Sequence, residues 1–129
     1  MKRISRFGLL IASVLTACGM FASAVAAHHS AAAQYDRNKM KTLVGSVTKL
    51  EWINPHARLF IDVKDENGRT ANWEVELGAP AILIRRGWTR TAIKIGDPVT
   101  VSGALAKDGS NLINGTSVTL GDGTKVFSP

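Results

Sequence analysis

Tight-turn signals recur along the second half of the chain, and they constrain its fold more than any other feature of the sequence. Each is a glycine next to an Asn or Asp, the kind of pair that tight turns between strands prefer. The signals separate short apolar runs, so a strand protein is predicted from residue 42 onward. The four pairs are Asn67-Gly68, Gly96-Asp97, Asp108-Gly109 and Asp122-Gly123.

Two of the runs alternate between apolar and polar residues, which is typical of strands with one buried face. They span residues 57–64 and 70–77, and the turn at Asn67-Gly68 joins them as a hairpin. We predict that their apolar residues point into the core and that Trp73 is buried among them. These residues are Leu59, Ile61, Val63, Trp73, Val75 and Leu77.

Four further segments complete the predicted fold. The run 42–53 carries Gly45, as expected of a strand that bends to serve two sheets. Pro80 and Gly87 bracket one short helix within residues 79–88. Strands follow at 98–106 and 111–120, with Val99, Val101, Leu112, Val118 and Leu120 inward. This order predicts an all-β domain over residues 42–129, a five-stranded OB-like Greek-key barrel; an open β-sandwich with the helix at its side is the alternative.

The first 27 residues have the layout of a cleaved signal peptide, with a basic start, an apolar run and small residues before the cut. Cleavage after Ala26 or Ala27 leaves His28 and His29 at the mature end, on an arm that spans residues 28–41. We therefore expect an exported, periplasmic protein. The alternative is lipoprotein processing at Cys18, because residues 15–18 resemble a lipobox, and a membrane is an expected partner only in that case.

Composition excludes several functional classes. Cys18 is the only cysteine, so the mature chain has no disulfide, thiolate metal site or cysteine nucleophile. The whole chain has 16 Lys and Arg against 10 Asp and Glu. Lys2, Arg3 and Arg6 leave with the signal peptide, so the mature excess is +3, from 13 cations and the same 10 acids. Because this excess is small, we predict no nucleic acid among the partners.

The three histidines occupy two places in the chain: His28 and His29 at the mature amino terminus, and His56 in the corner between the first two strands. A terminal amine with a nearby imidazole is a nitrogen ligand set that suits Cu(II) or Ni(II). We predict a metal site formed by His28, His29 and His56, with copper as the cofactor. The alternative is that the terminal pair merely follows the cleavage site and that His56 hydrogen-bonds within a turn.

A second predicted ligand site consists of aromatic and polar residues, Trp52, Asn54, Arg86 and Trp88. The alternative for Trp88 is a place in the core. Two other functions stay open, an enzyme that uses the corner of Asn54, His56 and Glu74, and oligosaccharide or oligonucleotide binding on the barrel face. Only one internal histidine and no nucleophile accompany that corner, so a role other than catalysis is favoured.

Several short motifs resemble those of a family of small exported proteobacterial proteins of unknown function. The most specific are Asn54-Pro55-His56 and Arg85-Arg86-Gly87-Trp88, and the resemblance covers essentially the whole mature chain. It implies export and an OB-like barrel, and it assigns no activity and no catalytic residue. The other matching motifs are His28-His29-Ser30, Tyr35-Asp36, Gly45 with Val47, Glu51-Trp52-Ile53, Asn72-Trp73-Glu74, Gly96-Asp97 and Asp108-Gly109-Ser110.

Together these features predict an exported OB-like binding module that is not an enzyme. Its partner is expected to be a small ligand, a metal ion such as copper, or another protein of the cell envelope. Fold analogy alone cannot choose among these ligands.

Overall fold

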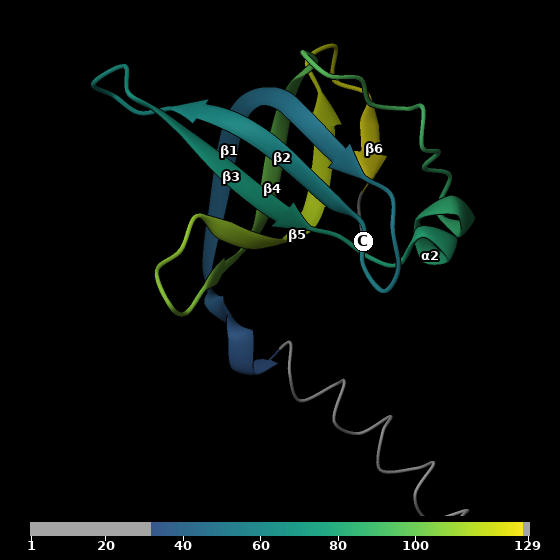
Figure 1. Ribbon diagram of the computed structural model, residues 1–129, viewed down its shortest axis with the longest axis horizontal. Helices are drawn as coiled ribbons and strands as arrows, with labels where there is room; N and C mark the ends of the chain where they lie inside the picture. Colours follow the sequence, from purple (N-terminus) through teal and green to yellow (C-terminus); the bar gives the residue numbers. More distant parts are fainter. Residues whose placement is uncertain (1–31, 128–129) are drawn as a thin grey trace, which may run out of the picture. The chain divides into compact units, whose positions relative to one another are not determined.

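From Tyr35 to Phe127 the chain consists of six strands and one short helix (Figure 1). The computed structural model describes residues 32–127, so the predicted signal peptide and residues 28–31 of the predicted arm lie outside it. Within that range no helix is both long and apolar enough to cross a membrane. The elements are β1 (Tyr35–Glu51), β2 (Arg58–Lys64), β3 (Thr70–Glu76), α2 (Pro80–Arg85), β4 (Pro98–Ala106), β5 (Leu112–Leu120) and β6 (Lys125–Phe127).

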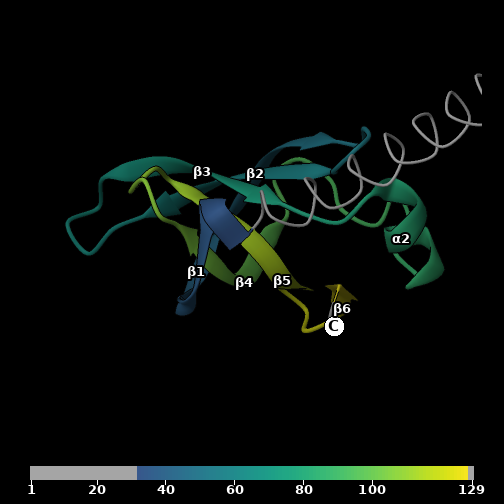
Figure 2. The ribbon, with the colours of Figure 1, turned by 90° about the horizontal axis from the view of Figure 1, so that it is seen from below.

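The strands form one sheet, in the order β3-β2-β1-β4-β5-β6, that closes on itself. Neighbours pair antiparallel, and a short parallel pairing of β3 with β5 closes the ring, with residues 74–76 beside residues 112–114. The β2–β3 hairpin and α2 lie on opposite sides of this barrel (Figure 1, Figure 2). The predicted all-β barrel of OB type is confirmed. The short β6, which follows the turn at residues 122–123, is a strand that the sequence did not predict.

The first strand begins earlier than predicted. β1 starts at Tyr35, which pairs with Ala106 of β4, whereas the predicted arm ran to residue 41 and the predicted strand began at Thr42. The pairing shifts register after Asp36 and resumes at Met40. Side chains from residue 37 to residue 42 are all exposed. This part of β1 therefore lacks the apolar alternation by which a strand is recognised.

The predicted inward faces are confirmed at most positions, with Leu59, Ile61, Val75, Leu77, Val99, Val101 and Val118 buried. Val63 is half-buried, and the prediction that Trp73 is buried is wrong. Trp73 packs against the core but stays partly exposed. The reason is its place in the barrel: Glu74 is the first residue of β3 that pairs with β5, so Trp73 lies just beyond the closure.

In β5 the buried residue is Ile113 rather than the predicted Leu112, which is only half-buried. The pairing of β4 with β5 shifts register after Ser102. A bulge of this kind adds one residue to one strand and so exchanges the faces of the residues on either side of it. Val118 is buried as predicted, whereas Leu120 is half-buried near the end of the strand.

The predicted helix is present as α2, at Pro80–Arg85. Pro80 occupies its first turn, where a missing backbone N–H costs nothing. Gly87 follows with φ 87°, a left-handed conformation that favours glycine after a helix. Leu83 on the helix and Trp88 after it are fully buried in the main core cluster, so the core alternative for Trp88 is the correct one.

Trp88 and Trp73 differ in exposure, and this difference gives a direct test of the barrel. Trp88→Ala empties a fully buried site and is expected to cost about 3–5 kcal/mol of unfolding free energy. Trp73→Ala is expected to cost clearly less, because part of that ring is already in water. Urea unfolding of both variants measures the difference, and equal losses, or a larger loss for Trp73→Ala, would contradict the position of the closure.

Candidate functional site

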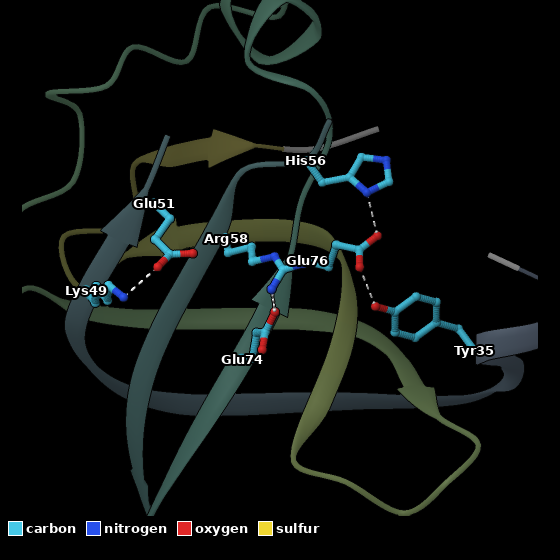
Figure 3. Close-up of polar contacts among 7 residues, drawn as sticks. All are labelled: Tyr35, Lys49, Glu51, His56, Arg58, Glu74 and Glu76. Carbon is cyan, nitrogen blue, oxygen red and sulfur yellow. Dashed lines mark hydrogen bonds and ion pairs between the residues drawn. The ribbon is translucent and has the colours of Figure 1, made fainter. Parts of the chain in front are cut away.

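Glu76, the last residue of β3, connects two neighbouring side chains (Figure 3). Its Oε2 accepts a hydrogen bond of 2.8 Å from the hydroxyl of Tyr35, and its Oε1 lies 2.9 Å from Nδ1 of His56. The Glu76 side chain is only 12% exposed, whereas that of His56 is 48% exposed. A nearly buried carboxylate thus joins a buried phenol to an accessible imidazole.

Three segments of the chain bring this trio together. Tyr35 is the first residue of β1, and His56 lies in the connection from β1 to β2. Ala57 fixes that connection beside the end of β3, because its N–H donates to the carbonyl of Gly78 at 3.1 Å and its carbonyl accepts the N–H of Leu77 at 2.9 Å. The corner that carries His56 is therefore held beside the end of β3 by main-chain hydrogen bonds.

The hydrogen bonds determine which nitrogen of His56 carries a proton. An ionised carboxylate only accepts, so both partners of Glu76 must donate. His56 then donates through Nδ1–H, and the neutral ring has its lone pair on Nε2. The second ring nitrogen points away from Glu76 (Figure 3). Nε2 is therefore the nitrogen that His56 offers to a ligand.

Tyr35 is held in its protonated form. The residue is only 3% exposed. Burial raises the pKa of the Tyr35 hydroxyl well above its ordinary value, and the bond to the negatively charged Glu76 raises it further. The phenol therefore continues to donate to Glu76 throughout the neutral and mildly basic range.

The corner predicted for an enzyme is arranged differently from the prediction. His56 contacts Glu76, whereas Glu74 forms an ion pair with Arg58 (Figure 3). The distance from Oε1 of Glu74 to Nη1 of Arg58 is 3.1 Å. Asn54 is exposed in the same connection as His56. The structure thus brings His56 together with a carboxylate, but with the next outward residue of β3 rather than the predicted one.

The four predicted ligand residues lie in different surroundings. Trp52 packs edge-on against Trp88, with ring centroids 5.9 Å apart. Trp88 is fully buried, so it supports Trp52 and presents no surface of its own. Asn54 and Arg86 are exposed. Of the predicted set, only Trp52, Asn54 and Arg86 have surface that a ligand can reach.

Of the three predicted metal ligands, only His56 lies in the part of the chain that the structure describes. His28 and His29 precede it. Within residues 32–127, no three His, Cys, Asp or Glu side chains gather closely enough to hold a metal ion. The copper site stays a prediction.

Two residues of the trio were missed by sequence reasoning. Tyr35 was assigned to the arm, and Glu76 was not among the predicted site residues. The bond between them joins residues 41 positions apart, and no local pattern announces such a contact. The one available signal was the resemblance motif Tyr35-Asp36, which marked that part of the arm without giving it a role.

A model described as "Family of unknown function (DUF6152)" matches residues 16–116 of the chain. No curated protein matches the chain significantly.

Three solved structures are similar to the barrel. The mitochondrial single-stranded DNA binding protein Rim1 of S. cerevisiae has a TM-score of 0.50 and 12% identity, over 64% of this chain and 92% of Rim1. The N-terminal domain of PriB from Thermoanaerobacter tencongensis has a TM-score of 0.47 and 15% identity, over 65% of this chain and 97% of that chain. A small single-stranded DNA-binding protein from Streptomyces coelicolor has a TM-score of 0.41 and 21% identity, over 63% of this chain and 89% of that chain.

The prediction of no nucleic acid among the partners is corrected by this comparison. It rested on the small excess of positive charge. The fold that the chain shares with Rim1 is one that a single-stranded DNA binding protein uses, so net charge was not a sufficient ground for that exclusion.

Tyr35 is the only tyrosine in the chain, so its ionisation can be followed directly by the ultraviolet absorbance of tyrosinate. The neutral phenol is favoured in the folded state. Its stabilisation is therefore complete below the unfolded pKa of about 10 and is lost as pH rises above it. We expect the native protein to show no tyrosinate near pH 10, where urea-unfolded protein is about half ionised.

Two controls complete the titration. Tyr35→Phe should remove the tyrosinate signal and reduce the loss of stability above about pH 10, because the raised pKa is then absent. Ionisation of native Tyr35 at the same pH as in the unfolded chain would contradict the bond to Glu76.

Proposed function

The chain belongs to the DUF6152 family of unknown function, and on the geometry of its corner we propose that it is an exported, non-catalytic binding module that holds a copper ion at His56. The proposal rests on one observation above all, the bond from Nδ1 of His56 to Glu76. It also requires export, which we infer from the signal-like sequence of residues 1–27.

The contact between His56 and Glu76 has the arrangement found behind many metal-binding histidines. A carboxylate that accepts from one ring nitrogen orients the ring and makes the other nitrogen a better ligand. Glu76 is itself held by the hydroxyl of Tyr35, so its position is fixed before any ion binds. Nε2 of the half-exposed His56 side chain then has a defined direction, and the ring has a fixed tautomer.

Copper fits this donor better than the hard cations do. Neutral imidazole is a ligand of Cu, Zn and Ni, whereas Mg and Ca prefer oxygen. A single imidazole binds weakly, so further nitrogen ligands are needed. We propose that the terminal amine with His28 or His29 supplies them, which would leave Glu76 outside the coordination sphere as the orienting group.

Binding rather than catalysis is supported by the state of the nearby carboxylates. Glu74 is paired with Arg58, and Glu76 already accepts from two donors. Neither of these carboxylates is therefore placed to take a proton from a substrate, and we propose that the lone pair on Nε2 of His56 binds an ion rather than acting as a base.

The test is a Cu(II) titration of the mature protein beginning at His28, followed in three variants. His56→Ala is expected to weaken binding about tenfold or more, and Glu76→Gln by about 10- to 100-fold, since it removes the orienting group. Glu74→Gln is the matched control, on the same strand and face, and should leave the affinity unchanged. Affinity should also fall as pH drops below about 6.5, because the ligands must lose their protons.

A short peptide that copies residues 28–35 separates the fold from the free terminus. If the peptide, the mature protein and His56→Ala bind Cu(II) equally well, the terminal histidines act alone and the barrel adds nothing. That outcome would reject the copper site at His56.

Processing gives a separate prediction. Intact-mass measurement of the native protein is expected to find a soluble mature chain that begins at Ala27 or His28, because small residues precede that point. A chain that begins at Cys18 and carries acyl groups would contradict it and would establish the lipoprotein alternative.

A further inference from the structure

α2 presents apolar side chains to solvent on both sides of its outward face. Of its six residues only Leu83 is buried. Each residue turns a helix by about 100°, so Ile82 and Ile84 border the face opposite Leu83, and Arg85 lies near its centre. Ile82 is 41% exposed and Ile84 is 58% exposed. A helix with apolar residues on nearly every side is typically a covered one, yet within residues 32–127 nothing covers this face.

The connection from β1 to β2 extends the surface of α2. The ring of Trp52 packs against that of Trp88, whose N–H donates to the carbonyl of Leu83 at 3.0 Å. Ile53 follows Trp52 and is 52% exposed. This end of the barrel lies away from the β2–β3 hairpin (Figure 1, Figure 2). We define the α2 surface as six exposed residues: Ile53, Ile82, Ile84, Arg85, Arg86 and Arg90.

The two segments that form this surface contain only positive charges. Residues 52–57 and 77–96 include four Arg or Lys residues and no Asp or Glu. The same segments hold four of the six large apolar residues that are exposed within residues 32–127. Exposed apolar side chains and unopposed cations thus occur together. The four apolar residues are Ile53, Ile82, Ile84 and Ile95.

The acidic residues that flank these segments in the sequence are already engaged. Glu76 is nearly buried and accepts two hydrogen bonds. Asp97 is half-buried and accepts the main-chain N–H of Lys94 at 2.8 Å. Glu51 forms an ion pair with Lys49. Within residues 32–127, the arginines at positions 85 and 90 form no ion pair, so their charge is available to a partner.

This combination of side chains favours an anionic lipid surface as the partner. Helices that lie in the interface of a membrane place apolar residues at the boundary of the acyl chains and basic residues among the headgroups. Single-stranded nucleic acid would pair with the arginines, but it stacks its bases on aromatic rings and would leave the isoleucines in water. A bilayer is the partner that takes up both kinds of side chain at once.

We propose that the α2 surface binds reversibly to bilayers that contain anionic lipids. Its isoleucines would enter the boundary between headgroups and acyl chains, and its arginines would meet lipid phosphates. The stem of an arginine can lie along apolar surface while its guanidinium stays in the polar layer, so Arg85 fits between Ile82 and Ile84. This association requires neither an acyl group at Cys18 nor copper at His56.

The test is co-sedimentation of the copper-free mature protein, beginning at His28, with lipid vesicles. Vesicles of one part phosphatidylglycerol and two parts phosphatidylcholine are expected to bind the protein saturably, whereas phosphatidylcholine alone should not. Raising NaCl from about 0.1 M to about 0.5 M should weaken the binding, because salt screens the attraction. Equal retention by both kinds of vesicle, or retention by neither, would overturn the proposal.

Charge removal tests the arginines. Arg85→Gln combined with Arg90→Gln should weaken binding to the anionic vesicles about tenfold or more, since each cation near such a surface contributes to the attraction. The matched control is Lys64→Gln combined with Lys125→Gln, which removes the same charge at exposed residues of β2 and β6. The control should bind as the unmodified protein does. Equal weakening by the two pairs would show an effect of net charge and reject the α2 surface.

A second pair of variants tests the apolar contribution. Ile82→Ser combined with Ile84→Ser should also weaken binding about tenfold or more, because less apolar area enters the bilayer. Met40→Ser combined with Val44→Ser is the control, at two residues of β1 that are 55% and 66% exposed. It should leave the affinity unchanged. Unchanged affinity of the isoleucine variant would mean that no side chain enters the bilayer, and would contradict the proposal.

Three further outcomes would assign the α2 surface to another partner. Binding of an oligothymidine that is tighter than that of vesicles and requires Arg85 and Arg90 would assign it to single-stranded nucleic acid. Equally tight binding of polyglutamate would assign it to an acidic protein. Self-association that Ile82→Ser with Ile84→Ser abolishes would assign it to a second copy of the chain. The comparison of vesicle compositions uses the unmodified protein, so it stands even if a variant fails to fold.

Discussion

The three-residue pairing of β3 with β5 is the contact that determines the surroundings of both Glu76 and Trp73. It closes the barrel at Glu74–Glu76 and Leu112–Asn114. Glu76 lies inside this closure, where it is nearly buried and meets Tyr35 and His56. Trp73 lies just outside it, at the open end, where the ring is partly exposed above a hollow.

The sequence predicted those parts of the fold that follow from local pattern. Alternation placed Leu59, Ile61 and Val75 in the core, and the bracketing of α2 by Pro80 and Gly87 was confirmed. Errors occurred where tertiary pairing overrides pattern. The polar start of β1 is a strand because β4 pairs with it, and Ile113 replaces Leu112 in the core because a register shift changes the face of β5. Neither the pairing with β4 nor the register shift can be recognised from a short stretch of sequence.

The residues of the candidate site divide in the same way, into those that the sequence pattern predicts and those that tertiary pairing brings in. His56 was identified from its rarity and its place in a corner, both of which are visible in the sequence. Its partner Glu76 and the second donor Tyr35 were missed, because barrel closure and the long β1 strand bring them together. The ligand role predicted for Trp88 was wrong for a related reason: the residue after α2 is directed into the core, where it supports Trp52. Residue type was thus a better guide to the candidate site than place in the sequence. Which residues lie together became clear only from the fold.

The central claim is that Glu76 fixes the ring of His56 so that Nε2 faces a ligand. Nitrogen NMR of the histidine ring measures this directly, because protonated and unprotonated ring nitrogens have distinct shifts and couplings. At a pH above the ordinary histidine pKa of about 6.5, the account predicts a single tautomer for His56, with the proton on Nδ1 and the lone pair on Nε2. Glu76→Gln should remove this preference. A His56 ring that carries its proton on Nε2, or that exchanges between both forms as a solvated imidazole does, would contradict the account.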